Sequence, residues 1–325
     1  MADVSNSIQK YITTVITIPK DDVTSAIRSR EWFLDRVKGE IKKREKEPIL
    51  YSEDPILYFG SYFRGTQVST VDEFDVMLVI DSNNGVFSVN DSAVGHGLGK
   101  ADPNYKYTQK FYFEDKNSVS PIKILNWQKG IIGTVVESYG GECPERRGQS
   151  VTAYIKSKEL KIDVVPGGIF KRDEDGKIFY IIPSGSQSKT WIMTSPRDDK
   201  ERLTHAANGK SNFKNVIRIA KRIKDQYNFL VSSFAIETTI IDYSNSASWY
   251  NDLYLDTRGV LKHISEVFKT GVITDPFDKK TNMIANAQSL EYYAKRIDDI
   301  ITEITSCEFL DQKISDENIR LIFEN

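Results

Sequence analysis

The chain has 325 residues, a hydrophobic fraction of 39%, a charged fraction of 28% and a formal net charge of −2. This composition is that of a globular protein with one large domain or two medium ones, and it argues against a protein dedicated to binding duplex nucleic acid. The two cysteines lie far apart in sequence and predict neither a zinc site nor a disulfide framework. Because we find no apolar run of membrane-spanning length and no signal peptide, we expect a cytoplasmic protein that does not contact a membrane.

The first part of the chain alternates helical and extended patterns. Residues 5–18 predict a short helix, and residues 21–46 predict a longer one because apolar side chains recur along one face at helical spacing. Residues 83–104 contain several Gly, Ser and Asn and predict a loop or a short hairpin. Residues 107–113 alternate like a strand, and Ser120, followed by proline, is expected to begin a helix as its N-cap.

The most informative stretch contains a Gly-Ser turn followed by an apolar strand that carries two carboxylates at its entrance. Glu73 and Asp75 are two residues apart, so on a strand both side chains lie on the same face. Two adjacent carboxylates repel each other unless a cation lies between them, and a pair of divalent ions would also hold the oxygens of a phosphoryl group. Gly60 and Ser61 can offer backbone N–H groups and a hydroxyl to a phosphate. The alternative is an ordinary acidic strand edge after a turn.

A third carboxylate lies in a separate strand. Residues 151–155 and 160–165 predict two strands, the second stopped by the Pro-Gly-Gly sequence at 166–168. Asp163 lies inside the second strand, where an unpaired carboxylate costs several kcal/mol. It is either a third metal ligand or an edge aspartate paired with an arginine, and the other two carboxylates favour the ligand. Asp72, next to one of them, is expected to point away from the metals.

The pattern becomes helical after residue 191. Lys214, Arg218 and Lys221 form a basic stripe beside an apolar one, and this stripe is either a solvated face or a clamp for a triphosphate. Ser233 and Phe234 begin a further helix, in which Phe234 is either a core residue or a stacking partner for a base. The apolar stripe consists of Phe213, Val216, Ile217, Ala220, Ile223 and Tyr227.

The order of these elements predicts an α+β protein. Residues 1–190 are expected to form a mixed-sheet lobe with N-terminal helices, and residues 191–325 a helical lobe. A cleft between two such lobes is a usual place for a ligand.

These motifs resemble the signature of the cGAS/DncV-like nucleotidyltransferases, which belong to the DNA polymerase beta-like superfamily. The resemblance implies a polymerase-beta-like nucleotidyltransferase lobe packed on a C-terminal lobe like that of the oligoadenylate synthases, and it covers most of the chain. It rests on the sequence Gly60-Ser61-Tyr62-Phe63-Arg64-Gly65-Thr66, on Glu73-Phe74-Asp75 with Asp163, and on the weaker segments at 191–196, 216–221, 232–234 and 275–276.

The resemblance implies an enzyme that makes a cyclic di- or oligonucleotide second messenger from nucleoside triphosphates. Its product would act on a separate effector protein. The three carboxylates Glu73, Asp75 and Asp163 would hold two Mg²⁺ or Mn²⁺ ions. The nucleotide would be bound by Gly60, Ser61, Lys221, Ser233 and Phe234.

Among the family's branches the chain most resembles the bacterial anti-phage (CBASS) enzymes, although its Glu73-Phe74-Asp75 form is similar to the animal branch. The DNA-sensing animal members carry a Cys/His zinc insert that two distant cysteines cannot build, which argues against activation by duplex DNA. Two alternatives stay open. One is a template-independent nucleotidyltransferase acting on RNA or protein; the other is a non-catalytic Mab21-like binding module, which a missing carboxylate would favour, and none is missing.

Overall fold

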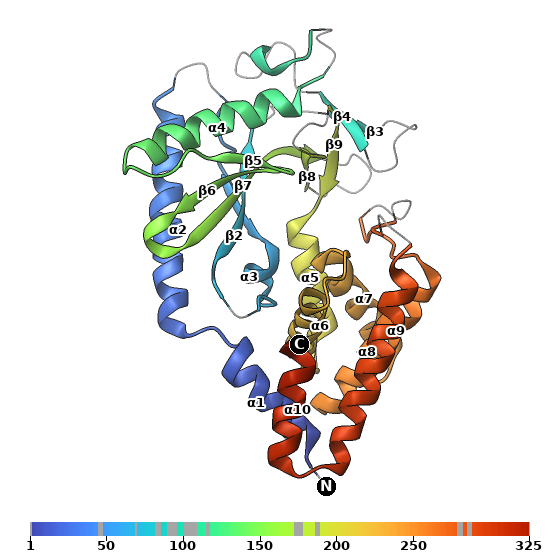
Figure 1. Cartoon of the computed structure of the whole chain (residues 1–325). Helices are drawn as coiled ribbons and strands as arrows, with labels where there is room; N and C mark the ends of the chain where they lie inside the picture. The colour runs from blue at the N-terminus through green and yellow to red at the C-terminus, as the bar shows by residue number, and fades with distance from the viewer. Residues whose placement is uncertain are drawn as a thin grey trace. The chain divides into compact units, whose positions relative to one another are not determined.

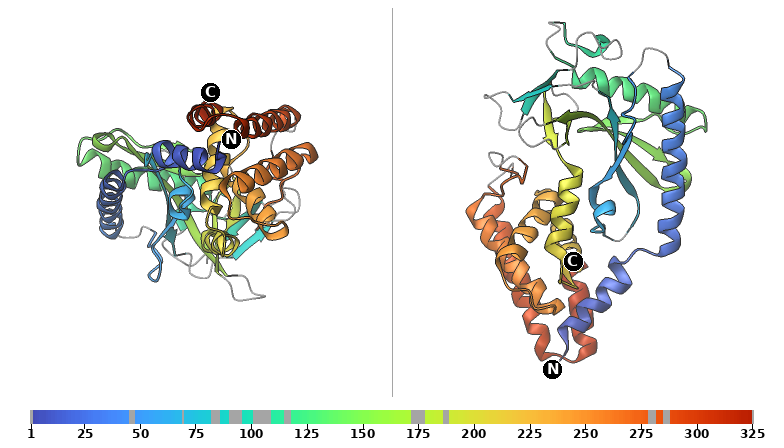
Figure 2. Two further views of the ribbon diagram at one scale, coloured as in Figure 1. Left: turned by 90° about the horizontal axis from the view of Figure 1, so that it is seen from below. Right: turned by 180° about the vertical axis from the view of Figure 1, so that it is seen from behind.

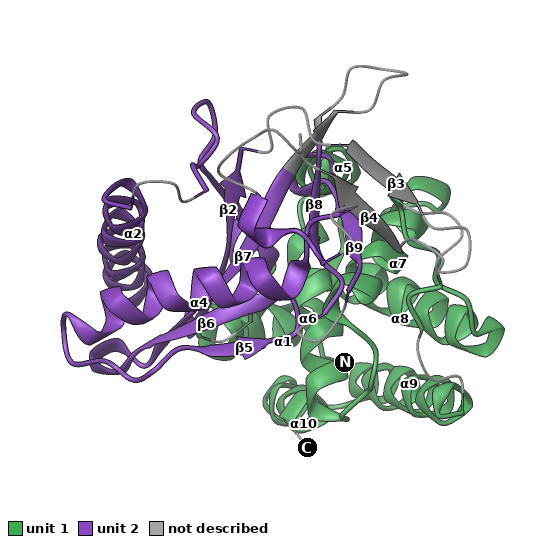
Figure 3. Ribbon diagram, turned by 90° about the horizontal axis from the view of Figure 1, so that it is seen from above, with its two compact units in different colours: residues 1–18, 65–70, 199–325 green, residues 19–64, 71–198 purple. Residues whose placement is uncertain are grey.

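The structure is a computed structural model in which the chain forms two compact units (Figure 3). Unit 1 comprises Met1–Ile18, Gly65–Thr70 and Asp199–Asn325, and unit 2 comprises Pro19–Arg64 and Val71–Asp198. The described residues are 2–44, 48–68, 70–81, 86–89, 96–100, 109–114, 118–171, 178–185, 189–277, 282–284 and 288–324.

Unit 2 is built on a mixed sheet, as predicted. The strands follow the order β1-β2-β7-β8-β9-β4-β3, with β6 also paired to β7 and β5 to β6. Strands β2 and β7 are parallel, and the other paired strands are antiparallel. The strands span Ile56–Phe59 (β1), Glu73–Ile80 (β2), Val86–Val89 (β3), His96–Lys100 (β4), Glu145–Arg147 (β5), Ser150–Ile155 (β6), Leu160–Lys171 (β7), Ile178–Pro183 (β8) and Trp191–Thr194 (β9).

Two long helices cover one face of this sheet (Figure 1). They are α2 (Lys20–Lys42) and α4 (Pro121–Glu137), and a one-turn helix α3 (Gly60–Arg64) connects β1 to the segment before β2. Alternate residues of β2, among them Phe74, pack in the core beneath α2 and α4, which stabilises the unit by about 1.5–3 kcal/mol per large side chain. Ser120 caps α4 by accepting a hydrogen bond from the backbone N–H of Lys123, as expected.

Unit 1 is helical and has its own core. The predicted apolar stripe of α6 is buried in this core, with Tyr227 packed at its edge. Helix α1 lies beside α10 (Figure 2), and the hydroxyl groups of Ser7 and Ser315 are hydrogen-bonded at 2.9 Å. The elements span Val4–Tyr11 (α1), Ile12–Ile16 (π-helix), Pro196–Ala207 (α5), Phe213–Gln226 (α6), Ser233–Ser246 (α7), Leu253–Thr270 (α8), Leu290–Ser306 (α9), Cys307–Phe309 (3₁₀-helix) and Gln312–Glu324 (α10).

Two predictions about strands were wrong. The Pro-Gly-Gly sequence does not stop β7, which continues to Lys171. Pro166 lies between the end of the β6 pairing at Val164 and the start of the β8 pairing at Gly168, where one side of β7 has no neighbouring strand and a residue without an N–H is tolerated. In the segment expected to be a strand at 107–113, the described residues form a 3₁₀-helix, Gln109–Phe111, followed by a single antiparallel β-bridge between Tyr112 and Val119.

We expected a division into residues 1–190 and 191–325, and the two compact units divide the chain differently. The first eighteen residues belong to the helical unit because apolar side chains of α1 and the π-helix, such as Ile8 and Ile12, lie in its core. The short segment Gly65–Thr70 also belongs to unit 1. Within the parts of the chain that the structure describes, no helix combines the length and apolar character needed to cross a membrane.

Candidate active site

Neighbouring strands bring the three predicted carboxylates together in unit 2. Asp75 of β2 lies opposite Asp163 of β7 in the parallel register, and Glu73 lies two residues earlier on β2. One carboxylate oxygen of each residue lies within 4.8 Å of those of the other two. Phe74 and Val76 are buried, as expected for the opposite face of the strand. We refer to Glu73, Asp75 and Asp163 as the acidic triad.

Gly60 lies against the acidic triad. It follows β1, whose last residue, Phe59, is paired with Asp75, and its φ of +74° is in the left-handed region that favours glycine. A Cβ atom at this position would overlap the Asp75 carboxylate. Backbone conformation and space therefore both require glycine here, and Ser61 follows it in α3.

The electrostatics of the acidic triad favour a bound cation. Burial raises the pKa of Glu73, and the negative charges of Asp163 and Asp72 raise it further, while the positive charges of Lys161 and Arg147 lower it. A divalent ion would offset this mutual repulsion, and a cluster of carboxylate oxygens suits hard ions such as Mg²⁺ and Mn²⁺. Asp72 contributes no oxygen to the cluster, in agreement with the prediction that it points away.

Asp163 is held by a neutral hydroxyl group. Thr152 lies opposite it on β6, and the Oγ1 atom of Thr152 donates a hydrogen bond to Oδ1 of Asp163. Among the described residues Asp163 has no arginine partner, and its hydrogen bond with Thr152 argues against the alternative of an ion-paired edge aspartate. Thr152 was not among the predicted site residues, although it lies in a predicted strand next to that of Asp163 in the sequence.

Lys221 is a buried residue of unit 1. Its side chain is 6% exposed, and that of Glu237 on α7 is 2% exposed. The Nζ atom of Lys221 lies 3.1 Å from Oε1 of Glu237 and donates to the carbonyl oxygen of Thr66 at 3.0 Å. The hydroxyl of Thr66 donates to the same Glu237 oxygen at 2.8 Å. These contacts favour a role for Lys221 in holding unit 1 together over direct contact with a triphosphate.

The rest of the predicted basic stripe also faces the segment Gly65–Thr70. Arg218 donates to the carbonyl oxygen of Gly65 at 2.9 Å, and burial lowers the pKa of its guanidinium group. The amine of Lys214 lies so close to Gly65 that a Cβ there would be 3.2 Å from it. The stripe is therefore more than a solvated face, since it holds the chain that follows the Gly-Ser turn.

Ser233 and Phe234 lie at the beginning of α7, also in unit 1. Ser233 is the first residue of the helix, and Ser232 caps it by accepting a hydrogen bond from the N–H of Ala235. The ring of Phe234 is half-buried and stacks on Phe277, with ring centroids 6.5 Å apart and planes inclined by 11°.

Comparison with known proteins identifies two curated relatives. A protein of Bacillus cereus (strain VD146) named as a probable cyclic nucleotide synthase is 26% identical over 294 residues, covering 90% of this chain and 85% of its own length. A cyclic GMP-AMP synthase-like receptor of Aethina tumida is 22% identical, covering 93% of this chain and 88% of its own. No family model matches the chain. These two relatives, the mixed sheet and the acidic triad support the resemblance of the chain to the cGAS/DncV-like nucleotidyltransferases.

Proposed function

We propose that this protein makes a cyclic di- or oligonucleotide from nucleoside triphosphates. The observation that carries the proposal is the acidic triad, whose oxygens come from two parallel strands and lie within 4.8 Å of one another. The names of the two relatives support the same chemistry. When bound, two Mg²⁺ or Mn²⁺ ions would stabilise the charge that develops on the transferred phosphoryl group.

In the proposed reaction the acidic triad holds the ions and Asp163 also moves a proton. Thr152 occupies Oδ1 of Asp163, which leaves Oδ2 to accept the proton of the attacking ribose hydroxyl. That attack on the α-phosphate of a second nucleotide releases pyrophosphate. A second attack, by the free ribose hydroxyl of the linear product on its own α-phosphate, closes the ring and releases a second pyrophosphate.

Several residues are proposed to position the nucleotide. We assign the Gly-Ser turn to the phosphate oxygens, with Ser61 contributing its hydroxyl; the close approach of the Gly60 backbone to Asp75 supports this assignment. Ser233 is assigned to the triphosphate and Phe234 to the base, because aromatic rings stack on bases. The pairing of Lys221 with Glu237 reduces the charge it can offer a triphosphate.

The biological role we propose is immune signalling against phage, in which the product acts on a separate effector protein. This part of the proposal rests on resemblance to the bacterial enzymes. It includes no activation by duplex DNA, since the chain has two cysteines far apart and lacks the residues of the zinc insert.

The test is to incubate the pure protein with all four nucleoside triphosphates and Mg²⁺ or Mn²⁺, treat the mixture with phosphatase, and analyse it by mass spectrometry. We expect phosphatase-resistant cyclic products from the wild type. Asp75→Asn keeps the size of the side chain and removes its charge, so we expect a rate at least about a hundredfold lower. Equal product from both proteins would disprove the role of Asp75.

A separate measurement distinguishes the alternatives. The same reaction with labelled nucleotides, total RNA and a protein extract would place label in macromolecules if the enzyme extends RNA or modifies protein. Absence of any nucleotide transfer, together with absence of Mg²⁺-dependent nucleotide binding in calorimetry, would indicate a binding module instead.

A further inference from the structure

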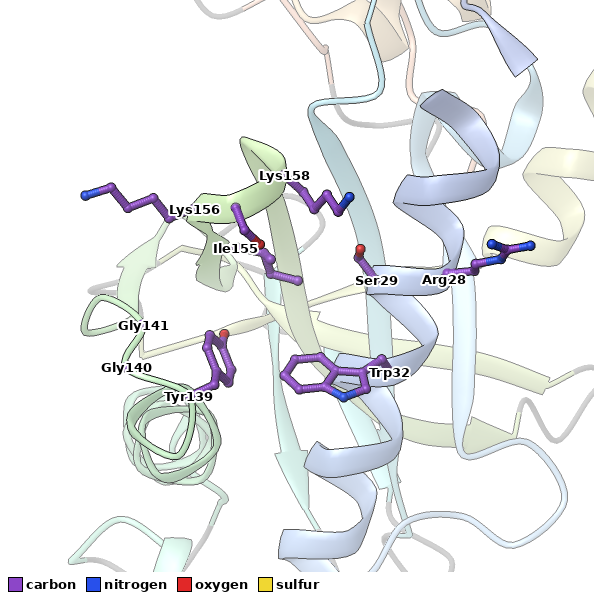
Figure 4. A pocket seen from close by; sticks show the side chains of 10 residues that line it. Arg28, Ser29, Trp32, Tyr139, Gly140, Gly141, Ile155, Lys156 and Lys158 are labelled. Carbon is purple, nitrogen blue, oxygen red and sulfur yellow. The ribbon is translucent and has the colours of Figure 1, made fainter. Parts of the chain in front are cut away.

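Unit 2 contains an open hollow between α2 and the ends of α4 and β6 (Figure 4). Its volume is about 740 Å³, within the range of about 300–1,000 Å³ that holds small ligands in proteins. Its lining includes Trp32 from α2, Tyr139 and Gly140 after α4, Ile155 at the end of β6, and Lys158 just after that strand. None of the residues of the acidic triad lines it.

Aromatic rings form one side of this hollow. The rings of Trp32 and Tyr139 lie 5.2 Å apart in an edge-to-face arrangement, and both belong to the lining (Figure 4). Trp32 is 40% exposed, which is high for so large an apolar residue. Arg36 lies over its ring at 4.5 Å and fixes its orientation. An exposed, oriented indole in a hollow suits a planar aromatic ligand.

A second hollow, of about 480 Å³, shares Arg28, Ser29 and Lys158 with the first. The remaining lining consists of Thr24, Ser25 and one carboxylate, Asp21. Within the part of the chain that the structure describes, Arg28 and Lys158 have no ion-pair partner, and both are exposed. The hydroxyl groups of Thr24 and Ser29 donate to carbonyl oxygens of α2, so the two cations are the groups that suit a phosphate.

We propose that these two hollows form a nucleotide-binding site distinct from the acidic triad. The base would stack on Trp32 beside Tyr139, and the phosphate would bind to Arg28 and Lys158. The ligand class follows from the arrangement, because one continuous surface offers an aromatic half and a cationic half with Ser29 where they meet.

The test is isothermal titration of AMP into the full chain in EDTA. Without metal, the acidic triad repels phosphate, so binding there is suppressed. We expect wild-type binding that quenches tryptophan fluorescence. Lys158→Glu should weaken it about tenfold to a hundredfold, the effect of losing a charge-assisted hydrogen bond. Trp32→Leu should weaken it about tenfold through lost stacking and remove the quenching.

Lys42→Glu is the matched control, because it makes the same charge change at an exposed lysine of α2 that lines neither hollow. It should bind AMP like the wild type. The proposal is overturned if the wild type does not bind AMP, if Lys158→Glu and Lys42→Glu bind equally, or if tripolyphosphate binds as tightly as AMP. Binding of a single-stranded oligonucleotide but not of AMP, lost in Lys158→Glu, would also overturn it and assign the surface to nucleic acid.

Discussion

The buried ion pair of Lys221 and Glu237 makes a quantitative prediction about folding. Replacing Lys221 by methionine keeps most of the side-chain volume but removes the cation beside a carboxylate that is 2% exposed. It also removes the donor to the Thr66 carbonyl oxygen. We expect Lys221→Met to lower the free energy of unfolding by about 3–5 kcal/mol, the usual cost of breaking a buried ion pair on one side.

A double-mutant cycle separates the ion pair from other effects. Glu237→Gln alone leaves the ammonium group of Lys221 buried beside a neutral amide, so it should also cost about 3–5 kcal/mol. Combining both substitutions removes both charges and keeps an oxygen that accepts from the Thr66 hydroxyl. The double variant should lose only about 1–3 kcal/mol, for the unsatisfied Thr66 carbonyl. The expected coupling is therefore at least about 3 kcal/mol.

The assay is urea denaturation of the four proteins, followed by circular dichroism. Lys224→Met is the control, because Lys224 is on the same helix and its partner Asp225, at 2.7 Å, is 53% exposed; it should cost less than about 1 kcal/mol. The reasoning is refuted if Lys221→Met costs less than about 1 kcal/mol and the cycle is additive within about 0.5 kcal/mol. A raised KM for nucleoside triphosphate in a stable Lys221→Met protein would then assign the lysine to the substrate.

Three further predictions concern the acidic triad. Gly60→Ala should abolish nucleotide transfer and lower the free energy of unfolding by about 1–3 kcal/mol, because the new Cβ meets the Asp75 carboxylate at a left-handed φ; a fully active variant would contradict the close approach. Thr152→Val should lower kcat while Thr152→Ser restores it, because serine keeps the donor to Asp163; equal rates would contradict a role for the hydroxyl. Burial raises the pKa of Glu73 in the folded protein, so the folded state favours the protonated carboxyl. In metal-free buffer the free energy of unfolding therefore falls as pH rises through the interval between the unfolded and folded pKa of Glu73. Glu73→Gln should then raise the Tm at pH 7 in EDTA and not at pH 4, and Mg²⁺ should raise the Tm of the wild type more than that of the variant; a variant with the lower Tm at pH 7 in EDTA would refute this.

The helices were predictable because helical periodicity is a local property. The stripe that begins at Phe213 is buried as expected, and Ser120 caps α4 as its sequence indicated. The failures arose where partners from elsewhere in the chain decide the outcome. Pro166 predicts the end of a strand, but pairing with β2 and, from Gly168, with β8 continues β7 past it. Likewise, periodicity shows that α1 has an apolar face but not that the face packs against α10.

The site shows the same division between local and non-local information. The spacing of Glu73 and Asp75 placed both on one face, and the strand around Asp163 required a compensating group. Their meeting depends on the parallel pairing of β2 with β7, which no local pattern contains. Thr152 was missed because its position opposite Asp163 depends on the register of the antiparallel pair β6–β7. The assignment of Lys221 to a phosphate stays a prediction, because a basic stripe shows the charge of a helix face and not the carboxylate that a neighbouring helix brings to it.

Charged groups in this chain are treated in two opposite ways, and the contrast separates structure from chemistry. Lys221 and Glu237 are deeply buried and neutralise each other within hydrogen-bonding distance. In the acidic triad, by contrast, like charges are held together by strand register, and the pKa of Glu73 is raised by burial and by Asp163. Such repulsion lowers stability and is retained only where a ligand or a reaction uses it. A cation that bound the acidic triad would therefore offset this repulsion and stabilise the fold. Thr152, which donates to Asp163, and the Gly60 backbone, which lies against Asp75, fix where that cation can bind.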